Sequence, residues 1–158
     1  MCRRAHVVDA LQISALVNDF VAEKALLPRT AEQIALALDN YVVAVDAGGR
    51  VLACAAIDEY SPSVAEVASV AVLRAVQGRG LGTLVVGAAE QMARQRGFSE
   101  VFAMSLVGRL FLSMGYEHSG LDGYPEKQRR YEYLSAAGVE IVPKPCFRKR
   151  LGAERSRR

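Results

Sequence analysis

The first 40 residues follow a helical pattern of apolar and polar positions that is interrupted once. Apolar residues recur at roughly helical spacing after Asp9, whose side chain can cap a helix that starts there. Pro28 interrupts this pattern. Thr30 then precedes Gln33 at the spacing of a capping box, which predicts a second helix through Leu38.

The middle of the chain changes to the pattern of strands. Residues 41–45 and 51–57 are apolar runs, and the turn sequence Asp46-Ala47-Gly48-Gly49 between them predicts a hairpin. The elements expected after it are, in order, a strand at 64–73, a glycine-rich loop at 78–82, a helix to about residue 96, a strand at 101–106, a short helix at 109–114 and strands at 116–119 and 139–142. This order indicates an α/β or α+β domain around a mixed sheet.

Length and composition narrow the class of protein. The chain has 158 residues, of which 51% are hydrophobic and 23% are charged, so it suits one domain with a buried core and is not a disordered chain. No uncharged apolar stretch approaches the roughly 20 residues that cross a bilayer, and no signal peptide is visible. We therefore expect a soluble cytoplasmic domain. The three cysteines, without a CxxC spacing, favour neither a disulfide framework nor a zinc site.

Charge is distributed unevenly along the chain. Residues 1–143 hold 13 Lys and Arg against 16 Asp and Glu, whereas residues 144–158 hold 7 against 1. We interpret 1–143 as the folded domain and 144–158 as a basic, solvated tail. Such a tail can contact nucleic acid, but Phe147 is its only aromatic residue, so nucleic acid is not expected as a partner.

The glycine-rich loop is the segment that suggests chemistry. Gly78, Gly80 and Gly82 let main-chain amides converge, and the helix that begins here adds the positive end of its dipole, so the loop suits a phosphate or pyrophosphate. A Walker A loop would need a Lys before Thr83, and a dinucleotide fingerprint would place its glycines after the first strand. A tight strand-to-helix turn without a ligand is the alternative.

Two motifs of this chain follow known patterns. Gln77-Gly78-Arg79-Gly80-Leu81-Gly82 fits Gln/Arg-x-x-Gly-x-Gly/Ala, and Phe111-Leu112-Ser113-Met114-Gly115-Tyr116 fits the aromatic-x-x-x-Gly-aromatic end of a short helix. With these two motifs the chain resembles the GNAT superfamily of acyl-CoA-dependent N-acyltransferases. The resemblance implies the GNAT fold, a single domain with a mixed, mostly antiparallel central sheet flanked by helices. It implies a short first strand before Ala5, acetyl-CoA as co-substrate, and no metal.

In this fold the loop amides would hold the pyrophosphate of acetyl-CoA, while the preceding strand would pair with the pantetheine arm and place the Val70 amide near the thioester carbonyl. The residues that the resemblance places at acetyl-CoA are Val70, Ala71, Val72, Gln77, Gly78, Arg79, Gly80, Leu81, Gly82 and Thr83.

Other segments resemble the amino-acid N-acetyltransferases of the N-acetylglutamate synthase type. Leu26-Leu27-Pro28-Arg29, Ala53-Cys54-Ala55-Ala56 and Ala65-Glu66-Val67-Ala68-Ser69-Val70-Ala71-Val72 each resemble a segment of that group. The resemblance implies transfer to the α-amine of an amino acid such as glutamate, a step in arginine biosynthesis. The alternatives are acetylation of another small amine or a protein N-terminus, and a non-catalytic acyl-CoA-binding module. A homodimer is compatible with each of them, and a membrane partner is not expected.

Four residues are candidates for the chemistry. Glu66 lies among apolar neighbours, which favour proton uptake by a carboxylate, and it is our candidate base; a structural glutamate that pairs with a helix is the alternative. Phe111 stands where many relatives carry a Tyr that protonates the departing thiolate, so Ser105 or a water takes this role. Arg29 can grip a substrate carboxylate, with Lys24 as a second candidate, although Arg29 can equally be a surface residue beside a helix.

Overall fold

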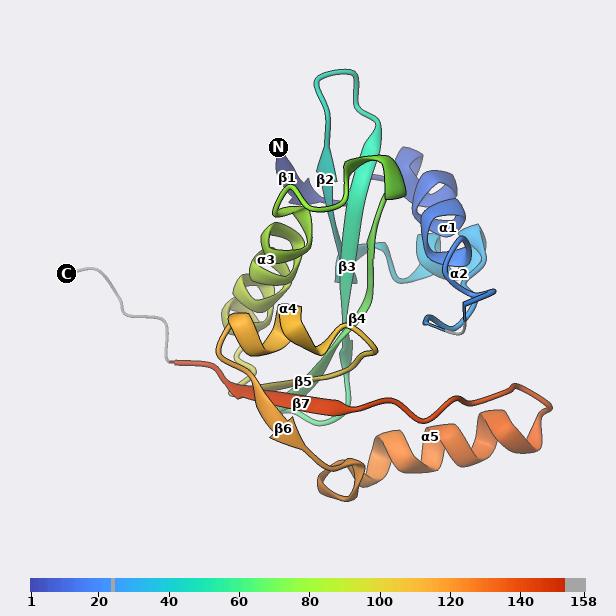
Figure 1. Ribbon diagram of the computed structural model, residues 1–158, viewed down its shortest axis with the longest axis vertical. Coiled ribbons are helices and arrows are strands. Elements are labelled where there is room, and N and C mark those ends of the chain that lie inside the picture. The colour runs from blue at the N-terminus through green and yellow to red at the C-terminus, as the bar shows by residue number, and fades with distance from the viewer. Residues whose placement is uncertain (24, 153–158) are drawn as a thin grey trace.

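A seven-stranded mixed sheet forms the centre of the protein, in a computed structural model that describes residues 1–23 and 25–152. The strands are β1 (Cys2–Arg4), β2 (Tyr41–Val45), β3 (Val51–Glu59), β4 (Val64–Val72), β5 (Glu100–Met104), β6 (Glu117–Ser119) and β7 (Cys146–Arg150). Their order in the sheet is β1-β2-β3-β4-β5-β7-β6 (Figure 1). Only β4 and β5 run parallel among these neighbours, which confirms the expected mixed, mostly antiparallel sheet.

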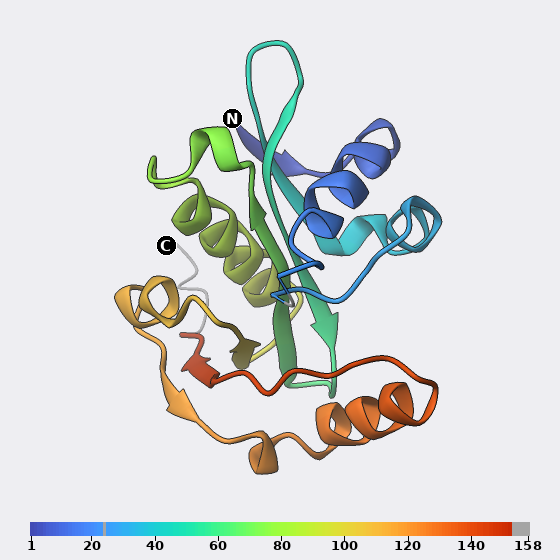
Figure 2. The same ribbon diagram turned by 45° about the vertical axis from the view of Figure 1, so that its right-hand side comes forward.

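Helices cover both faces of this sheet. They are α1 (Ala10–Asn18), α2 (Ala31–Leu36), α3 (Leu81–Gln95), α4 (Gly108–Ser113) and α5 (Pro125–Ala136). Figure 2 shows α1 and α2 on one side of β2 to β4 and α3 on the other. Both faces of the β2–β3 hairpin are apolar and must be buried. Alternate residues of the two strands enter two separate apolar clusters, one with Val42 and Ala53, the other with Val43 and Cys54.

Local hydrogen bonds confirm the second helix start and correct the first. Thr30 Oγ1 accepts from Gln33 N at 3.1 Å and Gln33 Oε1 accepts from Thr30 N at 2.9 Å, which is the predicted capping box of α2. Asp9, expected to cap α1, instead accepts from His6 N at 2.7 Å and from Arg3 Nη1 at 2.7 Å. Its carboxylate therefore ties β1 to the turn before α1.

The C-terminal quarter departs from expectation. Residues 139–142 are not a strand, and α5, which the sequence pattern did not predict, precedes them. The expectation of a solvated tail is wrong for residues 146–150, which form β7 between β5 and β6, whereas residues 153–158 lie outside the described residues. The physical reason is that β7 buries Phe147 and that two of its basic side chains are paired, Lys149 Nζ with Glu90 Oε1 at 2.8 Å and Arg148 Nε with Glu117 Oε1 at 2.9 Å.

An opening between the two parallel strands positions the site. β4 pairs with β5 only from Val64 to Glu66, although β4 continues to Val72. The register of β4 with β3 also shifts between Cys54 and Ala56, and Ser69 adopts a φ of 53° at this bulge. The last six residues of β4 therefore have no partner in β5, and the two strands separate toward their carboxyl ends.

No helix among the described residues is both long enough and apolar enough to span a bilayer.

Candidate active site

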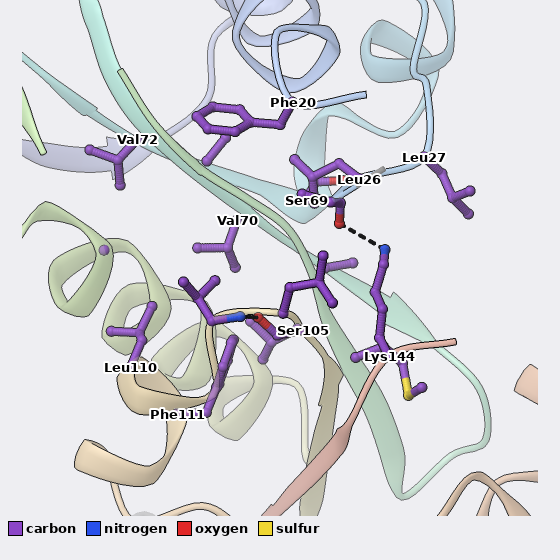
Figure 3. Close-up of a pocket in the computed structure, with 18 of the residues that line it drawn as sticks. Phe20, Leu26, Leu27, Ser69, Val70, Val72, Ser105, Leu110, Phe111 and Lys144 are labelled. Carbon is purple, nitrogen blue, oxygen red and sulfur yellow. Dashed lines mark hydrogen bonds between the residues drawn. The ribbon is translucent and has the colours of Figure 1, made fainter. Parts of the chain in front are cut away.

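A cavity of about 580 Å³ lies where β4 and β5 separate. Its walls come from β4 beyond Glu66, the glycine loop, the start of α3, the segment after β5, α4 and the connection between α1 and α2. Two residues of α5 and one of the segment before β7 complete them. In Figure 3, Val70 and Val72 face this space across from Leu110, and Lys144 reaches toward the loop that carries Leu26.

The glycine loop forms one end of the cavity. Gly78 and Gly80 have φ values of +80° and +81°, and the position of a Cβ at each would be open space. Gly80 is the N-cap of α3, a helix of 15 residues, so the amides of its first turn have no partner within the helix and the dipole is positive there. At Gly82 a Cβ would lie 3.3 Å from Leu110 Cδ2, which shows that α3 approaches α4 closely at this point. These features fit a diphosphate.

The main chain of β4 forms the next part of the wall. Leu73 N donates to Leu52 O of β3 at 2.8 Å, so the Val72 carbonyl, on the opposite side of the same peptide, points away from β3. Gln77 Nε2 donates to this carbonyl at 3.2 Å. Since residues two apart in a strand orient their amides alike, Val70 also turns its peptide groups toward the cavity. An extended ligand with amide groups, such as pantetheine, could therefore pair with this edge.

Glu66 lies in the wall and pairs with a helix, the arrangement that the structural alternative for this residue expected, although the sequence did not identify the partner. The Lys127 ammonium, on α5, donates to Glu66 Oε1 at 2.7 Å, and both side chains are 6% exposed. The same ammonium lies 4.6 Å from the ring centroid of Tyr131 and 5.7 Å from that of Tyr60. Burial, and then the charge of Glu66, raises the pKa of the Tyr131 hydroxyl, which therefore keeps its proton at neutral pH.

Ser105 lies directly after β5 and lines the cavity beside Phe111. Its hydroxyl oxygen accepts from Val107 N at 2.9 Å, and its own N–H donates to Pro145 O at 3.0 Å. In the bond with Val107 the Ser105 hydroxyl acts as the acceptor, so its own proton is not part of that bond. Phe111 is buried and packs edge-on against Tyr116, with 5.0 Å between ring centroids.

Arg29 lines the opposite end of the cavity. Its position is set by α1: Asn18 Oδ1 accepts from Arg29 N at 3.1 Å, and Ser14 Oγ donates to Arg29 O at 2.7 Å. The guanidinium uses Nη1 on the Pro28 carbonyl at 3.0 Å. Lys24 lies outside the described residues.

Most of the residues that the sequence analysis assigned to the site line this cavity. The predicted site residues that line it are Arg29, Glu66, Val70, Ala71, Val72, Gln77, Gly78, Gly80, Leu81, Gly82, Thr83 and Ser105. Arg79 is exposed and is not among the lining residues. Lys127, Tyr131 and Lys144 were not among the candidates, because no element was expected around the first two and Lys144 was assigned to the tail. Only the apolar neighbours of Glu66, which imply a compensating cation, could have pointed to Lys127.

A mixed sheet that opens between two parallel strands, beside a glycine loop at a helix start, defines an acyl-CoA-dependent N-acetyltransferase, and its cavity suits acetyl-CoA as the co-substrate. The chain belongs to the acetyltransferase (GNAT) family, whose family model matches residues 11–113. An uncharacterized N-acetyltransferase of Chlorobaculum tepidum is 34% identical over 125 residues, which are 79% of this chain and 80% of that protein.

Relatives with named activities are longer or more distant. An amino-acid acetyltransferase of Mannheimia succiniciproducens is 28% identical over 144 residues, 89% of this chain but 33% of that protein, so this chain spans about a third of it. The N-acetylglutamate synthase of Neisseria gonorrhoeae, complexed with coenzyme A and N-acetyl-glutamate, has a TM-score of 0.83 and 27% identity over 96% of this chain and 35% of its own. A Mycobacterium tuberculosis protein in complex with coenzyme A has a TM-score of 0.81 and 25% identity, covering 96% of this chain and 99% of its own.

Proposed function

We propose that this protein transfers the acetyl group of acetyl-CoA to the α-amine of an amino acid, with glutamate as the first candidate, which would place it in arginine biosynthesis. The observation that carries the proposal is the cavity itself. One end has the glycine loop and the free peptide edge of β4, and the other end has the cations Arg29, Lys127 and Lys144. The likeness to an N-acetylglutamate synthase bound to coenzyme A and N-acetyl-glutamate supports this choice of acceptor.

The reaction needs no nucleophile from the protein. The amine nitrogen attacks the thioester carbonyl carbon, a C–N bond forms and the C–S bond breaks. The nitrogen loses one proton as it becomes an amide, and this loss balances the proton that the departing thiolate takes up. We assign the Val70 amide to the carbonyl oxygen, to which it would donate as negative charge develops there, an interaction worth about 3 kcal/mol in comparable sites. Ser105, whose hydroxyl proton is not used on Val107, can supply the proton to the sulfur.

An α-ammonium must lose a proton before it can attack. Glu66 is the carboxylate in the cavity wall that we assign to this step. One of its oxygens accepts from Lys127, and a carboxylate can accept further bonds at both oxygens. Lys127 thus holds the carboxylate in one orientation while an acceptor ammonium approaches. Arg29 is assigned to an acceptor carboxylate.

A thiol-release assay with acetyl-CoA and a panel of amino acids, polyamines and peptides tests the proposal. We expect turnover with glutamate, a loss of about 10²–10⁴-fold in kcat for Glu66→Gln, and no change for Glu59→Gln at the exposed end of β3. Calorimetric titration with coenzyme A should show that Glu66→Gln still binds it.

Each part of the proposal can fail separately in these measurements. Turnover restricted to polyamines or peptides would refute an amino-acid acceptor. Binding of coenzyme A without turnover of any amine would show a non-catalytic module. Full activity of Glu66→Gln would remove the assigned base and leave acetyl transfer standing.

A further inference from the structure

The acceptor end of the cavity contains a cation that the chemistry above leaves unused. Lys144 lies on the segment between α5 and β7, and it lines the cavity although its neighbours Pro143 and Pro145 are exposed. Proline fixes its own φ and restricts the preceding residue to extended backbone, so the main chain on both sides of Lys144 is stiff. Pro145 O in turn accepts from Ser105 N at 3.0 Å, which anchors this segment to the end of β5.

The side chain of Lys144 extends to the connection between α1 and α2, where its ammonium makes a hydrogen bond. Its Nζ donates to Ala25 O at 2.7 Å, so it joins the segment before β7 to the connection between α1 and α2 (Figure 3). An ammonium carries three donors, and this bond uses one of them. Burial, together with the charge of Lys127, lowers the pKa of Lys144, while the charge of Glu66 opposes the shift.

The other ammonium in the cavity is already matched by a carboxylate. Lys127 pairs with Glu66 at 2.7 Å, and Arg74, at the cavity rim, pairs with Asp19 at 2.9 Å. Within residues 1–23 and 25–152, the structure gives Lys144 a carbonyl partner and no carboxylate partner. A half-buried cation held by stiff backbone beside the candidate base, with donors to spare, is a preformed anion-binding group.

We propose that Lys144 binds a carboxylate of the acceptor and so selects amines that carry a carboxylate over amines that do not. This inference rests on the proposed function and adds to it a specificity residue besides the assigned partner Arg29. A carboxylate next to the amine would accept from the two remaining donors of Lys144 while Glu66 takes the proton of the amine. Diamines and polyamines would instead meet an uncompensated positive charge there.

Steady-state kinetics with matched acceptors test this assignment. The acceptors are L-glutamate, its α-carboxamide (isoglutamine) and its γ-carboxamide (glutamine), and the variants are Lys144→Met and Lys144→Arg. Arg129→Met, which removes an exposed charge from α5 outside the cavity, is the control. We expect Lys144→Met to raise the KM for glutamate about 10–100-fold, to leave the KM for acetyl-CoA unchanged, and to abolish the preference for carboxylate over carboxamide at one of the two positions. Lys144→Arg should retain that preference.

The outcomes separate this inference from the proposed function. If no amine is acetylated by the unaltered protein, both fail. If glutamate is acetylated but Lys144→Met keeps both carboxylate preferences, or raises the KM of glutamate and of both carboxamides equally, Lys144 is not the carboxylate ligand and acetyl transfer stands. If the protein acetylates amines without a carboxylate as efficiently as glutamate, the selectivity assigned to Lys144 is likewise refuted.

Discussion

Replacing Lys127 by Met tests how strongly the buried ion pair between Glu66 and Lys127, in the cavity wall, stabilises the fold. The change removes the ammonium that lies 2.7 Å from Glu66 Oε1 and leaves a carboxylate in a site where both side chains are 6% exposed. Met has a similar length and no charge, so the apolar stem of the side chain is kept while the charge compensation is lost.

The expected effect is large because only one charge is removed. Breaking a buried pair on one side costs about 3–5 kcal/mol, since the remaining charge is neither solvated nor paired. The contact of the ammonium with the Tyr131 ring, at 4.6 Å from the centroid, adds to the loss. For a domain of this size about 1 kcal/mol shifts Tm by roughly 2–4 °C, so Lys127→Met should lower Tm by roughly 6–20 °C.

Urea unfolding at equilibrium, followed by far-UV circular dichroism because the chain has no Trp, measures the free energy of unfolding directly. Arg129→Met is the matched control on the same helix: its side chain is 71% exposed and lies 4.0 Å from Glu126, so its loss should change stability by no more than about 0.5 kcal/mol. The double variant Glu66→Leu with Lys127→Met buries neither charge and should be at least as stable as Lys127→Met alone.

Two results would refute this reasoning. A loss of less than about 1 kcal/mol in Lys127→Met would show that solvent reaches Glu66 and compensates its charge. A double variant that is less stable than Lys127→Met would show that Glu66 contributes through contacts other than the ion pair.

Two further predictions concern the glycine loop and the cysteines. Gly80→Ala and Gly49→Ala should each lower the free energy of unfolding by about 1–2 kcal/mol, because these glycines have φ values of +81° and +82°. Only Gly80→Ala should also weaken coenzyme A binding in calorimetry. Equal affinity of the two variants for coenzyme A would exclude a role of the loop. Burial raises the pKa of Cys54 to about 12 and that of Cys146 to about 11. At pH 8 iodoacetamide should therefore modify the less buried Cys2 first, which mass spectrometry would show. Early modification of Cys54 would contradict its burial. Since unfolded thiols ionise near 9.0 and these folded thiols do not, their contribution to stability is complete below that pH and is lost as pH rises toward 12.

The parts of the fold that could be predicted depend on short-range interactions. The capping box of Thr30 and Gln33 closes within four residues, and the turn between β2 and β3 follows from Asp46, whose Oδ1 accepts from Gly48 N and Arg50 N at 2.9 Å. The glycine loop is similar, because a positive φ at Gly80 is a property of that residue. The part of the site that we assign to the pyrophosphate of acetyl-CoA can therefore be predicted from the sequence.

The opening between β4 and β5 has no such signal. Residues 64–72 form one continuous strand in the sequence pattern and in the structure, yet pairing with β5 stops at Glu66. Beyond this point β4 also shifts its register with β3, at a bulge that includes Ser69, and this serine adopts a φ of 53°, which residues other than glycine rarely adopt. Its neighbours in the sheet, rather than its own side chain, select this conformation, so the cavity could be expected only through the family resemblance.

The acceptor end of the cavity was hidden for a different physical reason. Lys127 and Lys144 lie in a stretch whose polarity predicts solvent exposure, and a lysine is buried only where a partner removes the cost. The partners come from far along the chain: Glu66 is 61 residues from Lys127, and Ala25 is 119 residues from Lys144. The domain boundary that the charge distribution placed at residue 143 therefore assigned Lys144 to a solvated tail. The two ends of the cavity thus differ in how far the sequence predicts them: the glycine loop follows from the conformational freedom of local glycines, whereas only the folded sheet and the return of the chain through β7 bring the cations at the other end together.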